Sequence, residues 1–238
     1  MKRVVISQPM FFPWVGMFEQ TRLADVYVHY DDVQFSKGSF TNRVQLKTAR
    51  GSEWLSVPLR DLRLGQKIRE VAVDDRQDWR GRHLQMLADA FATAPFRDEM
   101  LALAKAVYAR PAATISEVAI ASMEAVWDYF PAARPREALW SSALGIGGQS
   151  SRRVLDVVKH VGGTHYITGH GARQYLDHAL FESEGVRVEY INYQKLAYPQ
   201  LHGEFTPYVS VLDLIANVGK DGPQVMVAGT VDWKEFAA

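Results

Sequence analysis

The sequence predicts an α/β protein with a mainly parallel sheet, helices on both of its faces and a helical insertion near residues 76–131. Two observations favour this class. Short runs of β-branched and aromatic residues, typical of buried strands, alternate with segments whose apolar residues have helical spacing. The order strand, loop, helix, strand opens the chain and resumes near Arg136, as expected for a parallel sheet. We expect residues 1–238 to form a single domain.

The first half of the chain contains three expected strands. Residues 4–6 form the first, which ends at Gln8-Pro9, and residues 26–30 form the second. A loop rich in proline and aromatic residues and a short helix over residues 18–23 separate these two strands. Residues 68–73 are the third expected strand. The polar segment before residue 68 predicts turns and short extended pieces.

The helical insertion contains the best-marked helix of the sequence. Thr114 and Glu117 form a capping box, in which each side chain accepts a hydrogen bond from the other residue's backbone amide. Apolar residues then recur at helical spacing until Pro131 stops the helix.

The second half returns to alternating strands and helices. We expect a strand near residues 138–144, a helix from Arg152 to Gly162, a strand over residues 165–168, a helix over residues 176–184 and a strand over residues 186–190. The glycine-rich stretch 145–151 precedes the first of these helices. It could hold a phosphate, or form a flexible turn in which Ser150 or Ser151 caps the helix. Asp213 lies in an otherwise apolar helix, where a buried carboxylate needs a partner.

Composition excludes several classes of protein. The chain is 47% hydrophobic and 23% charged, with 27 basic and 27 acidic residues, so it is typical of a globular protein without the basic excess of a nucleic-acid binder. Because it has no cysteine, disulfides, thiolate metal sites and cysteine nucleophiles are excluded. No apolar run approaches about 20 residues and the amino terminus lacks a signal peptide, so we expect a cytoplasmic protein without a membrane span.

Two adjacent acids give the strongest local signal for function. Asp31 and Asp32 follow the second strand, and ligands of open α/β sheets bind at the carboxyl ends of strands. We predict that both are catalytic and that Gln34, Asn42 and Arg43 bind substrate beside them. The planar guanidinium of Arg43 would suit a carboxylate or a phosphate. The alternative is a solvated loop in which one acid caps a turn.

The loop after the first strand is a second candidate. It leads into the first helix, which is where α/β proteins that bind nucleotides place phosphates. We predict that Gln8 and Trp14 contact substrate. The alternative is that Pro13, Trp14 and Phe18 only make the loop rigid.

A third candidate follows the strand at residues 165–168. His170 lies between Gly169 and Gly171, so its ring can face a cleft and act as a general base. We predict that His170 is catalytic and that Gly169, Gly171, Tyr175 and Asp177 bind substrate. The alternatives are a loop histidine with a structural hydrogen bond and, for Tyr175 and Asp177, a cap on the following turn.

No metal or cofactor is expected. The spacing of His160, His165 and His170, with His178 beyond, fits no zinc pattern, and they fall on a helix, a strand and a loop.

The sequence resembles the WbqC-like family in motifs that extend over nearly the whole chain. The resemblance rests first on Gln8-Pro9, Pro13–Phe18, Asp31–Phe35, Asn42-Arg43 and Trp54–Pro58, and then on Tyr166–Gly169 with Gly171, Tyr175–Asp177 and Phe205–Asp213. It implies a place in the biosynthesis of surface polysaccharides or specialised metabolites, but no particular reaction. In the family pattern the position after Gly169 is often not histidine, so the resemblance does not give His170 a catalytic role.

The function we expect is that of an enzyme, an amide-forming transferase. It would move an acyl or aminoacyl group onto a small-molecule amine, such as that of a sugar nucleotide or a carrier-bound intermediate, and an acyl or aminoacyl carrier is a candidate partner. Asp31, Asp32 or His170 would take the amine proton, while Asn42 and Arg43 would hold a phosphate, a carboxylate or the developing oxyanion.

Two alternatives stay open. One is a non-catalytic protein that binds a sugar nucleotide or a pathway enzyme, with Phe11, Phe12 and Trp14 as a recognition patch. The other is an ATP-dependent ligase, because the first loop resembles in position the signature loop of adenylate-forming and nucleotidyl-transferring proteins. That signature places two histidines around a glycine, and the stretch Pro13–Phe18 keeps Gly16 but has neither histidine.

Overall fold

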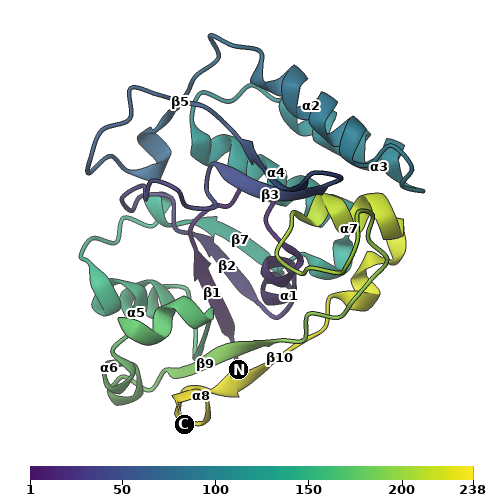
Figure 1. The fold of residues 1–238 in the computed structure, drawn as a ribbon. Coiled ribbons are helices and arrows are strands. Elements are labelled where there is room, and N and C mark those ends of the chain that lie inside the picture. Colours follow the sequence, from purple (N-terminus) through teal and green to yellow (C-terminus); the bar gives the residue numbers. More distant parts are fainter. Residues whose placement is uncertain (238) are drawn as a thin grey trace.

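The computed structural model describes residues 1–237 and is built on one six-stranded sheet (Figure 1). The strand order is β10-β9-β8-β1-β2-β7, and every neighbouring pair is parallel except β9 with β10. The expected fold class is therefore confirmed. The strands are β1 (Arg3–Ser7), β2 (Val26–His29), β7 (Glu137–Trp140), β8 (His165–Thr168), β9 (Arg187–Tyr193) and β10 (Ala228–Asp232).

The order of the strands reverses between β1 and β8. From β1 the chain moves outward to β2 and β7, and it then crosses to β8 and β9 on the other side of β1. In open parallel sheets a crevice opens outside the carboxyl ends of the strands at such a reversal, since the two crossover connections leave in opposite directions. The topology therefore predicts a crevice above Ser7 and Thr168.

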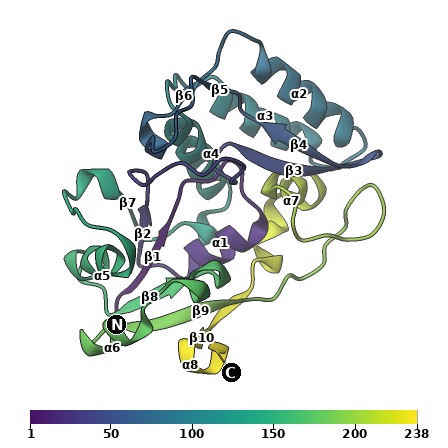
Figure 2. The ribbon, with the colours of Figure 1, turned by 60° about the vertical axis from the view of Figure 1, so that its left-hand side comes forward.

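Helices cover both faces of the sheet (Figures 1 and 2). Alternate strand residues point to two separate apolar clusters: Val5 and Tyr27 belong to one, Val4 and Val26 to the other. The first cluster includes the insertion helices, α1 and α7, whereas the second includes α5 and α6. The helices outside the insertion are α1 (Val15–Arg22), α5 (Ser150–His160), α6 (His178–Ser183), α7 (Val211–Val218) and α8 (Trp233–Ala237).

The segment expected as a helical insertion is helical over most of its length. Its helices are α2 (Trp79–Ala90), α3 (Arg97–Tyr108) and α4 (Ile115–Tyr129). The capping box of α4 is present, because Thr114 Oγ1 accepts from Glu117 N at 3.4 Å and Glu117 Oε2 accepts from Thr114 N at 2.9 Å. Among residues 1–237, no helix is long and apolar enough to cross a membrane.

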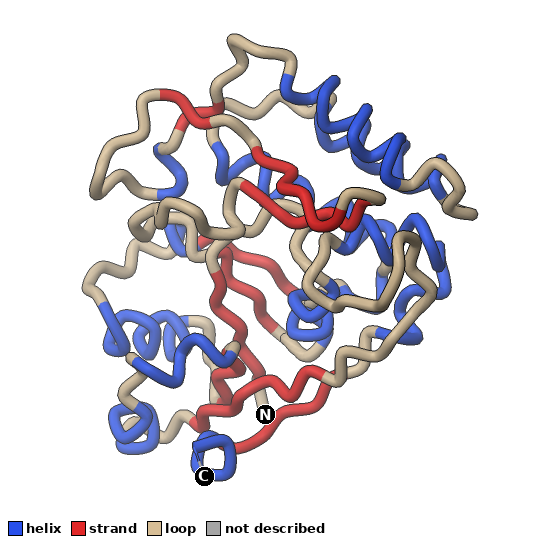
Figure 3. Tube along the Cα trace, viewed as in Figure 1, coloured by secondary structure: helices blue, strands red, loops and turns tan. Residues whose placement is uncertain are grey.

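Small antiparallel strands lie between the sheet and the insertion (Figure 3). They are β3 (Arg43–Thr48), β4 (Gly51–Ser56), β5 (Leu59–Arg60) and β6 (Ala72–Val73). The strand expected over residues 68–73 is wrong in its first half, where residues Ile68–Glu70 form the 3-10 helix η1. The reason is tertiary: the amides of Ile68 and Arg69 donate to the carbonyls of Val33 and Asp31, and this curls the segment around the end of β2.

The remaining 3-10 helices are short connections. They are η2 (Pro131–Ala133), η3 (Ser141–Ala143), η4 (His170–Gln174) and η5 (Gly219–Val225). Two of them follow sheet strands directly, η3 after β7 and η4 after β8, so their residues lie at the carboxyl edge of the sheet.

Candidate functional site

A pocket of about 620 Å³ opens at the carboxyl ends of the central strands, where the strand order reverses. Ser7 and Gln8 at the end of β1, Tyr30 after β2, and Thr168 and Gly169 at the end of β8 line it. Its volume is in the range of pockets that hold a whole small-molecule ligand. The predicted substrate residue Gln8 thus lies in the pocket, and its side-chain amide has no hydrogen-bond partner among residues 1–237.

Aromatic side chains form one wall of the pocket. The Trp14 ring lies 4.7 Å from the ring of Tyr193 and 5.8 Å from that of Tyr208, measured between centroids. Gly16 allows this arrangement, since a Cβ atom there would lie 2.3 Å from Trp14 Cη2. The glycine of the first loop therefore lets the indole fold back over the start of α1, and Trp14 lines the pocket as predicted.

His170 reaches the pocket from η4. Its Nε2 lies 2.7 Å from the carbonyl oxygen of Ile191. A carbonyl oxygen only accepts, so Nε2 carries the proton and Nδ1 of the neutral ring keeps its lone pair. The ring is further fixed by contacts with Tyr193 and Phe236, at 5.2 and 4.7 Å between centroids. This combination of a fixed ring and a basic nitrogen is what a general base requires.

The other residues predicted around His170 divide into two groups. Gly169, Gly171 and Tyr175 line the pocket, and Tyr175 is 65% exposed. Asp177 does not line the pocket. Its carboxylate accepts from Leu180 N at 3.1 Å and caps α6, as the alternative interpretation expected.

Several residues of the pocket were not predicted from the sequence, among them Lys195 and Tyr208. Lys195 Nζ donates to the Tyr208 hydroxyl at 2.8 Å. The sequence contained a signal for Lys195, because a lysine at a strand end on the carboxyl edge of a sheet is a candidate ligand group. The expected strand stopped at residue 190, however, whereas β9 continues to Tyr193 and brings Lys195 to that edge.

Asp31 does not line the pocket but supports the backbone after β7. Its carboxylate accepts from Ser142 N at 3.0 Å and from Ser142 Oγ at 2.7 Å. It also shares the single hydroxyl proton of Ser141, whose Oγ lies 3.1 Å away, with Asp32. The side chain is buried, and these bonds occupy its oxygens. This placement favours a structural role over the predicted catalytic one.

Asp32 forms a largely buried ion pair. Its Oδ2 lies 2.6 Å from Arg153 of α5, and its Oδ1 lies 2.5 Å from Ser141 Oγ. Burial alone would raise the pKa of Asp32, but the hydrogen bonds from Ser141 and Arg153 and the Arg153 charge together lower it. A carboxylate held ionised by a fixed cation is a poor proton acceptor, so the predicted role as a base is not supported by this geometry.

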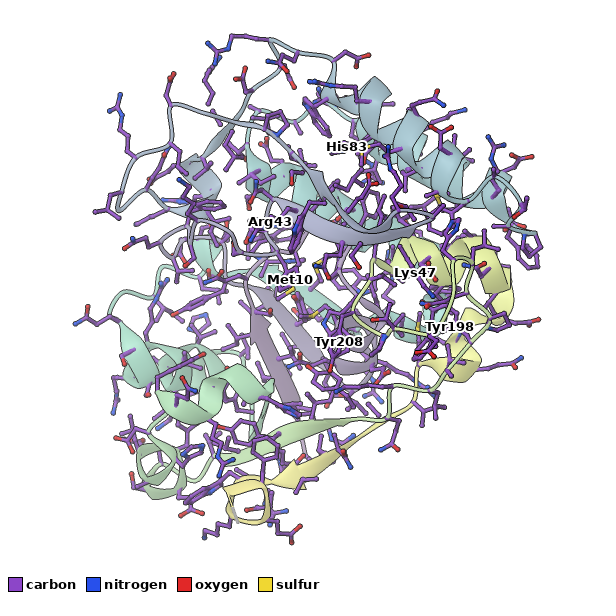
Figure 4. The ribbon with its side chains drawn as sticks, viewed as in Figure 1. Met10, Arg43, Lys47, His83, Tyr198 and Tyr208 are labelled. Atoms are coloured by element: carbon purple, nitrogen blue, oxygen red, sulfur yellow. The ribbon has the colours of Figure 1, made fainter. Side chains whose placement is uncertain are left out.

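The remaining predicted residues also lie outside the pocket lining. Arg43 donates to the Gly38 carbonyl at 3.1 and 2.7 Å and lies 4.1 Å from the centroid of the Trp54 ring. Asn42 Nδ2 donates to the Val57 carbonyl at 3.1 Å. Gln34 forms an isolated β-bridge with Lys67. Figure 4 shows Arg43 beside the small antiparallel strands.

The glycine-rich stretch before α5 also differs from expectation. Neither Ser150 nor Ser151 caps this helix, whose N-cap residue is Gln149 and has no side-chain cap. Ser151 Oγ instead accepts from Asp177 N at 2.9 Å and donates to the Tyr175 carbonyl at 3.3 Å. It therefore fixes the segment that carries Tyr175. In the described part of the chain, no three histidine, aspartate or glutamate side chains are grouped as a metal ion would need.

Comparison with known proteins gives the family of the chain. The model of the WbqC-like protein family matches residues 8–225. An uncharacterized protein of Mycobacterium tuberculosis is 31% identical over 229 residues, which cover 95% of this chain and 98% of that protein. No solved structure matches the chain significantly.

Proposed function

We propose that this chain, which belongs to the WbqC-like protein family, forms an amide by transferring an acyl or aminoacyl group onto an amine. The amine would be that of a sugar nucleotide or of a carrier-bound intermediate. One observation carries the proposal: His170 lines a pocket whose other polar groups are neutral apart from the ammonium group of Lys195. Its Nε2 donates to the Ile191 carbonyl, which leaves Nδ1 as the acceptor nitrogen of the neutral ring.

The reaction follows from this placement. The amine nitrogen attacks the carbonyl carbon of an activated acyl donor, such as a thioester, and a carbon–nitrogen bond forms. His170 Nδ1 takes the proton that the nitrogen loses and passes it to the leaving group as the bond from carbon to that group breaks. Donation from Nε2 to the Ile191 carbonyl strengthens as the ring becomes positive, which stabilises the protonated state.

Asp31 and Asp32 are left out of this mechanism. Both are held by Ser141, Ser142 or Arg153, whereas His170 carries an available basic nitrogen at the pocket. The amide of Gln8, which has no protein partner among the described residues, is a candidate hydrogen-bond donor to the developing oxyanion.

The test is amide formation by the purified protein. Amino-sugar nucleotides are incubated with acyl and aminoacyl thioesters, and the product is detected by mass spectrometry. We expect His170→Gln to lower kcat about 10²- to 10⁴-fold while substrate affinity changes little. His178→Gln is the matched control, because His178 bonds to the Tyr190 hydroxyl and does not line the pocket. Unchanged turnover in His170→Gln would exclude His170 as the base.

A second candidate function is binding without catalysis. The observation that favours it is that the two predicted acids are engaged in structural bonds, so that His170 is left as the candidate base of the pocket. Ligand binding by the wild-type protein without turnover of any donor, and unaltered in His170→Gln, would support this function and contradict the transferase.

A further inference from the structure

The segment 194–209 joins β9 to α7 without a helix or strand, and we call it the strap. Both of its ends reach the pocket, Lys195 near the start and Tyr208 near the finish. The bond from Lys195 Nζ to the Tyr208 hydroxyl, 2.8 Å long, ties these ends together. Figures 1 and 2 show the strap as a long loop that leaves β9 and runs past the β3–β4 hairpin before α7.

The middle of the strap is fastened to β3 by one buried lysine. Lys47 Nζ donates to Gln200 Oε1 at 3.2 Å, to the Gly203 carbonyl at 3.0 Å and to the Glu204 carbonyl. Burying an ammonium group is unfavourable unless its protons are hydrogen-bonded, and the strap supplies an acceptor for each of the three. Figure 4 shows Lys47 beside this loop, with Tyr198 next to it.

The strap is also fixed by bonds within itself and by a bond to α2. The Gln200 side chain accepts from Thr206 N and donates to the Thr206 carbonyl, both at 3.0 Å, and His202 Nε2 donates to the Ala90 carbonyl at 2.6 Å. Lys195 and His202 have positive φ angles of 50° and 67°. Such angles are unfavourable for residues other than glycine and persist where surrounding contacts determine the backbone. The strap is therefore a preformed element of the pocket.

The strap brings one positive charge to the pocket lining, and Glu19, outside that lining, is close enough to interact with it. Lys195 is the only lysine or arginine among the described residues that line the pocket, and none of these is an aspartate or a glutamate. An ammonium group is a point charge that suits phosphate, whereas bidentate binding of a carboxylate is the usual role of arginine. Trp14 and Tyr193 line the same pocket, so a bound base or sugar would meet aromatic side chains there.

We infer that Lys195 binds the phosphate of a nucleoside diphosphate in this pocket and that Lys47, through the strap, is the residue that positions it. The inference rests on the proposed function, since it identifies the amine substrate as a sugar nucleotide rather than a carrier-bound intermediate. The position agrees with the crevice in which open α/β sheets bind nucleotides.

Isothermal titration calorimetry tests this with UDP and ADP as probes. Uridine and adenosine lack the phosphates, and inorganic diphosphate lacks the nucleoside. We expect at least one nucleoside diphosphate to bind and to bind about tenfold or more tightly than its nucleoside or inorganic diphosphate. Lys195→Met should weaken that binding about tenfold or more and reduce its dependence on salt. Lys105→Met, an exposed change on α3, is the control and should bind as the wild type.

The role of Lys47 needs a different measurement, because Lys47 acts through the strap. Lys47→Met should weaken binding and increase hydrogen exchange over residues 194–209. Lys47→Arg should keep both at their wild-type values, since arginine keeps the charge and the donors. If Lys47→Met does not fold, the Lys47→Arg and Lys195→Met proteins still decide the question. Unchanged hydrogen exchange in a folded Lys47→Met protein would overturn its role.

Failure of this inference is distinguishable from failure of the transferase. No binding of either nucleoside diphosphate, or equal binding by Lys195→Met and the wild type, would overturn the inference even if amide formation were found on another amine. Nucleotide binding that depends on Lys195, with no amide formed from any donor, would support the inference and contradict the transferase.

Discussion

Two groups of polar residues at the carboxyl edge of the sheet differ in whether their hydrogen bonds are already made. After β2, Asp31 and Asp32 are bonded to Ser141, Ser142 and Arg153, and these bonds hold β2, η3 and α5 together. Between β1 and β8, Gln8 and His170 line the pocket, and the bond from His170 to the Ile191 carbonyl uses only Nε2 of its ring. A position at a strand end is therefore not enough to mark a functional residue. The polar groups whose bonding capacity is left over are the ones that can bind a ligand.

The largest effect should come from breaking the first group. Arg153→Met removes the cation that compensates Asp32, whose side chain is only 13% exposed, so a buried charge is left unpaired. We expect a loss of about 3–5 kcal/mol in the free energy of unfolding, measured by urea denaturation at neutral pH.

The adjacent Arg152 provides the control for that change. Its side chain is 58% exposed and pairs with Asp156 and Glu184, so Arg152→Met should cost less than about 1 kcal/mol. Equal losses in the two variants would mean that burial of the Asp32 pair does not decide its contribution.

Glu19 of α1 belongs to neither group. It is a buried acid whose Oε2 has no hydrogen-bond partner among residues 1–237. Burial raises its pKa to about 7, against the lowering effects of a backbone hydrogen bond at Gln194 and the charge of Lys195. Between the unfolded value of 4.5 and about 7, the folded protein binds the proton more tightly, so this group lowers stability as pH rises through that window.

Glu19→Gln should remove that pH dependence. We expect the variant to gain up to about 3 kcal/mol over the wild type at pH 8 and little at pH 4.5, from unfolding curves taken across this range. Burial lowers the pKa of His29 and His83 to about 4, so both destabilise the fold below pH 6.5, but this contribution cancels in the difference. A difference in stability that stays constant with pH would contradict a raised pKa.

The smallest effects should distinguish Asp177 from Tyr175, which lies two positions before it in the sequence. Asp177→Ala removes the cap of α6 and should cost about 1 kcal/mol of stability without changing ligand binding. Tyr175→Ala, at an exposed position in the pocket, should change stability by less than about 0.5 kcal/mol and weaken the binding of UDP or ADP. The opposite pattern, measured by calorimetry and denaturation, would reverse the assignment of these residues.

Local sequence patterns were sufficient for much of the fold. The strand over residues 165–168 has the predicted limits, and the capping box at Thr114 starts α4 as expected. Both depend on interactions within a few residues, such as side-chain periodicity and caps, which the sequence states directly. The antiparallel strand β10 and the extension of β9 to Tyr193 were not predicted, because their pairing depends on a partner strand more than 30 residues away.

The candidate site shows the same division. The order of residues along the chain shows that polar residues follow β1, β2 and β8. The pocket is indeed lined by Gln8, Trp14, Gly169, His170, Gly171 and Tyr175. Which polar groups stay available depends on contacts between distant segments, since Asp32 meets Arg153 across 121 positions and Lys47 meets Gln200 across 153. A hydrogen bond is a short-range interaction in space. Whether a polar side chain is satisfied is therefore set by the packing of distant segments, which no local pattern specifies.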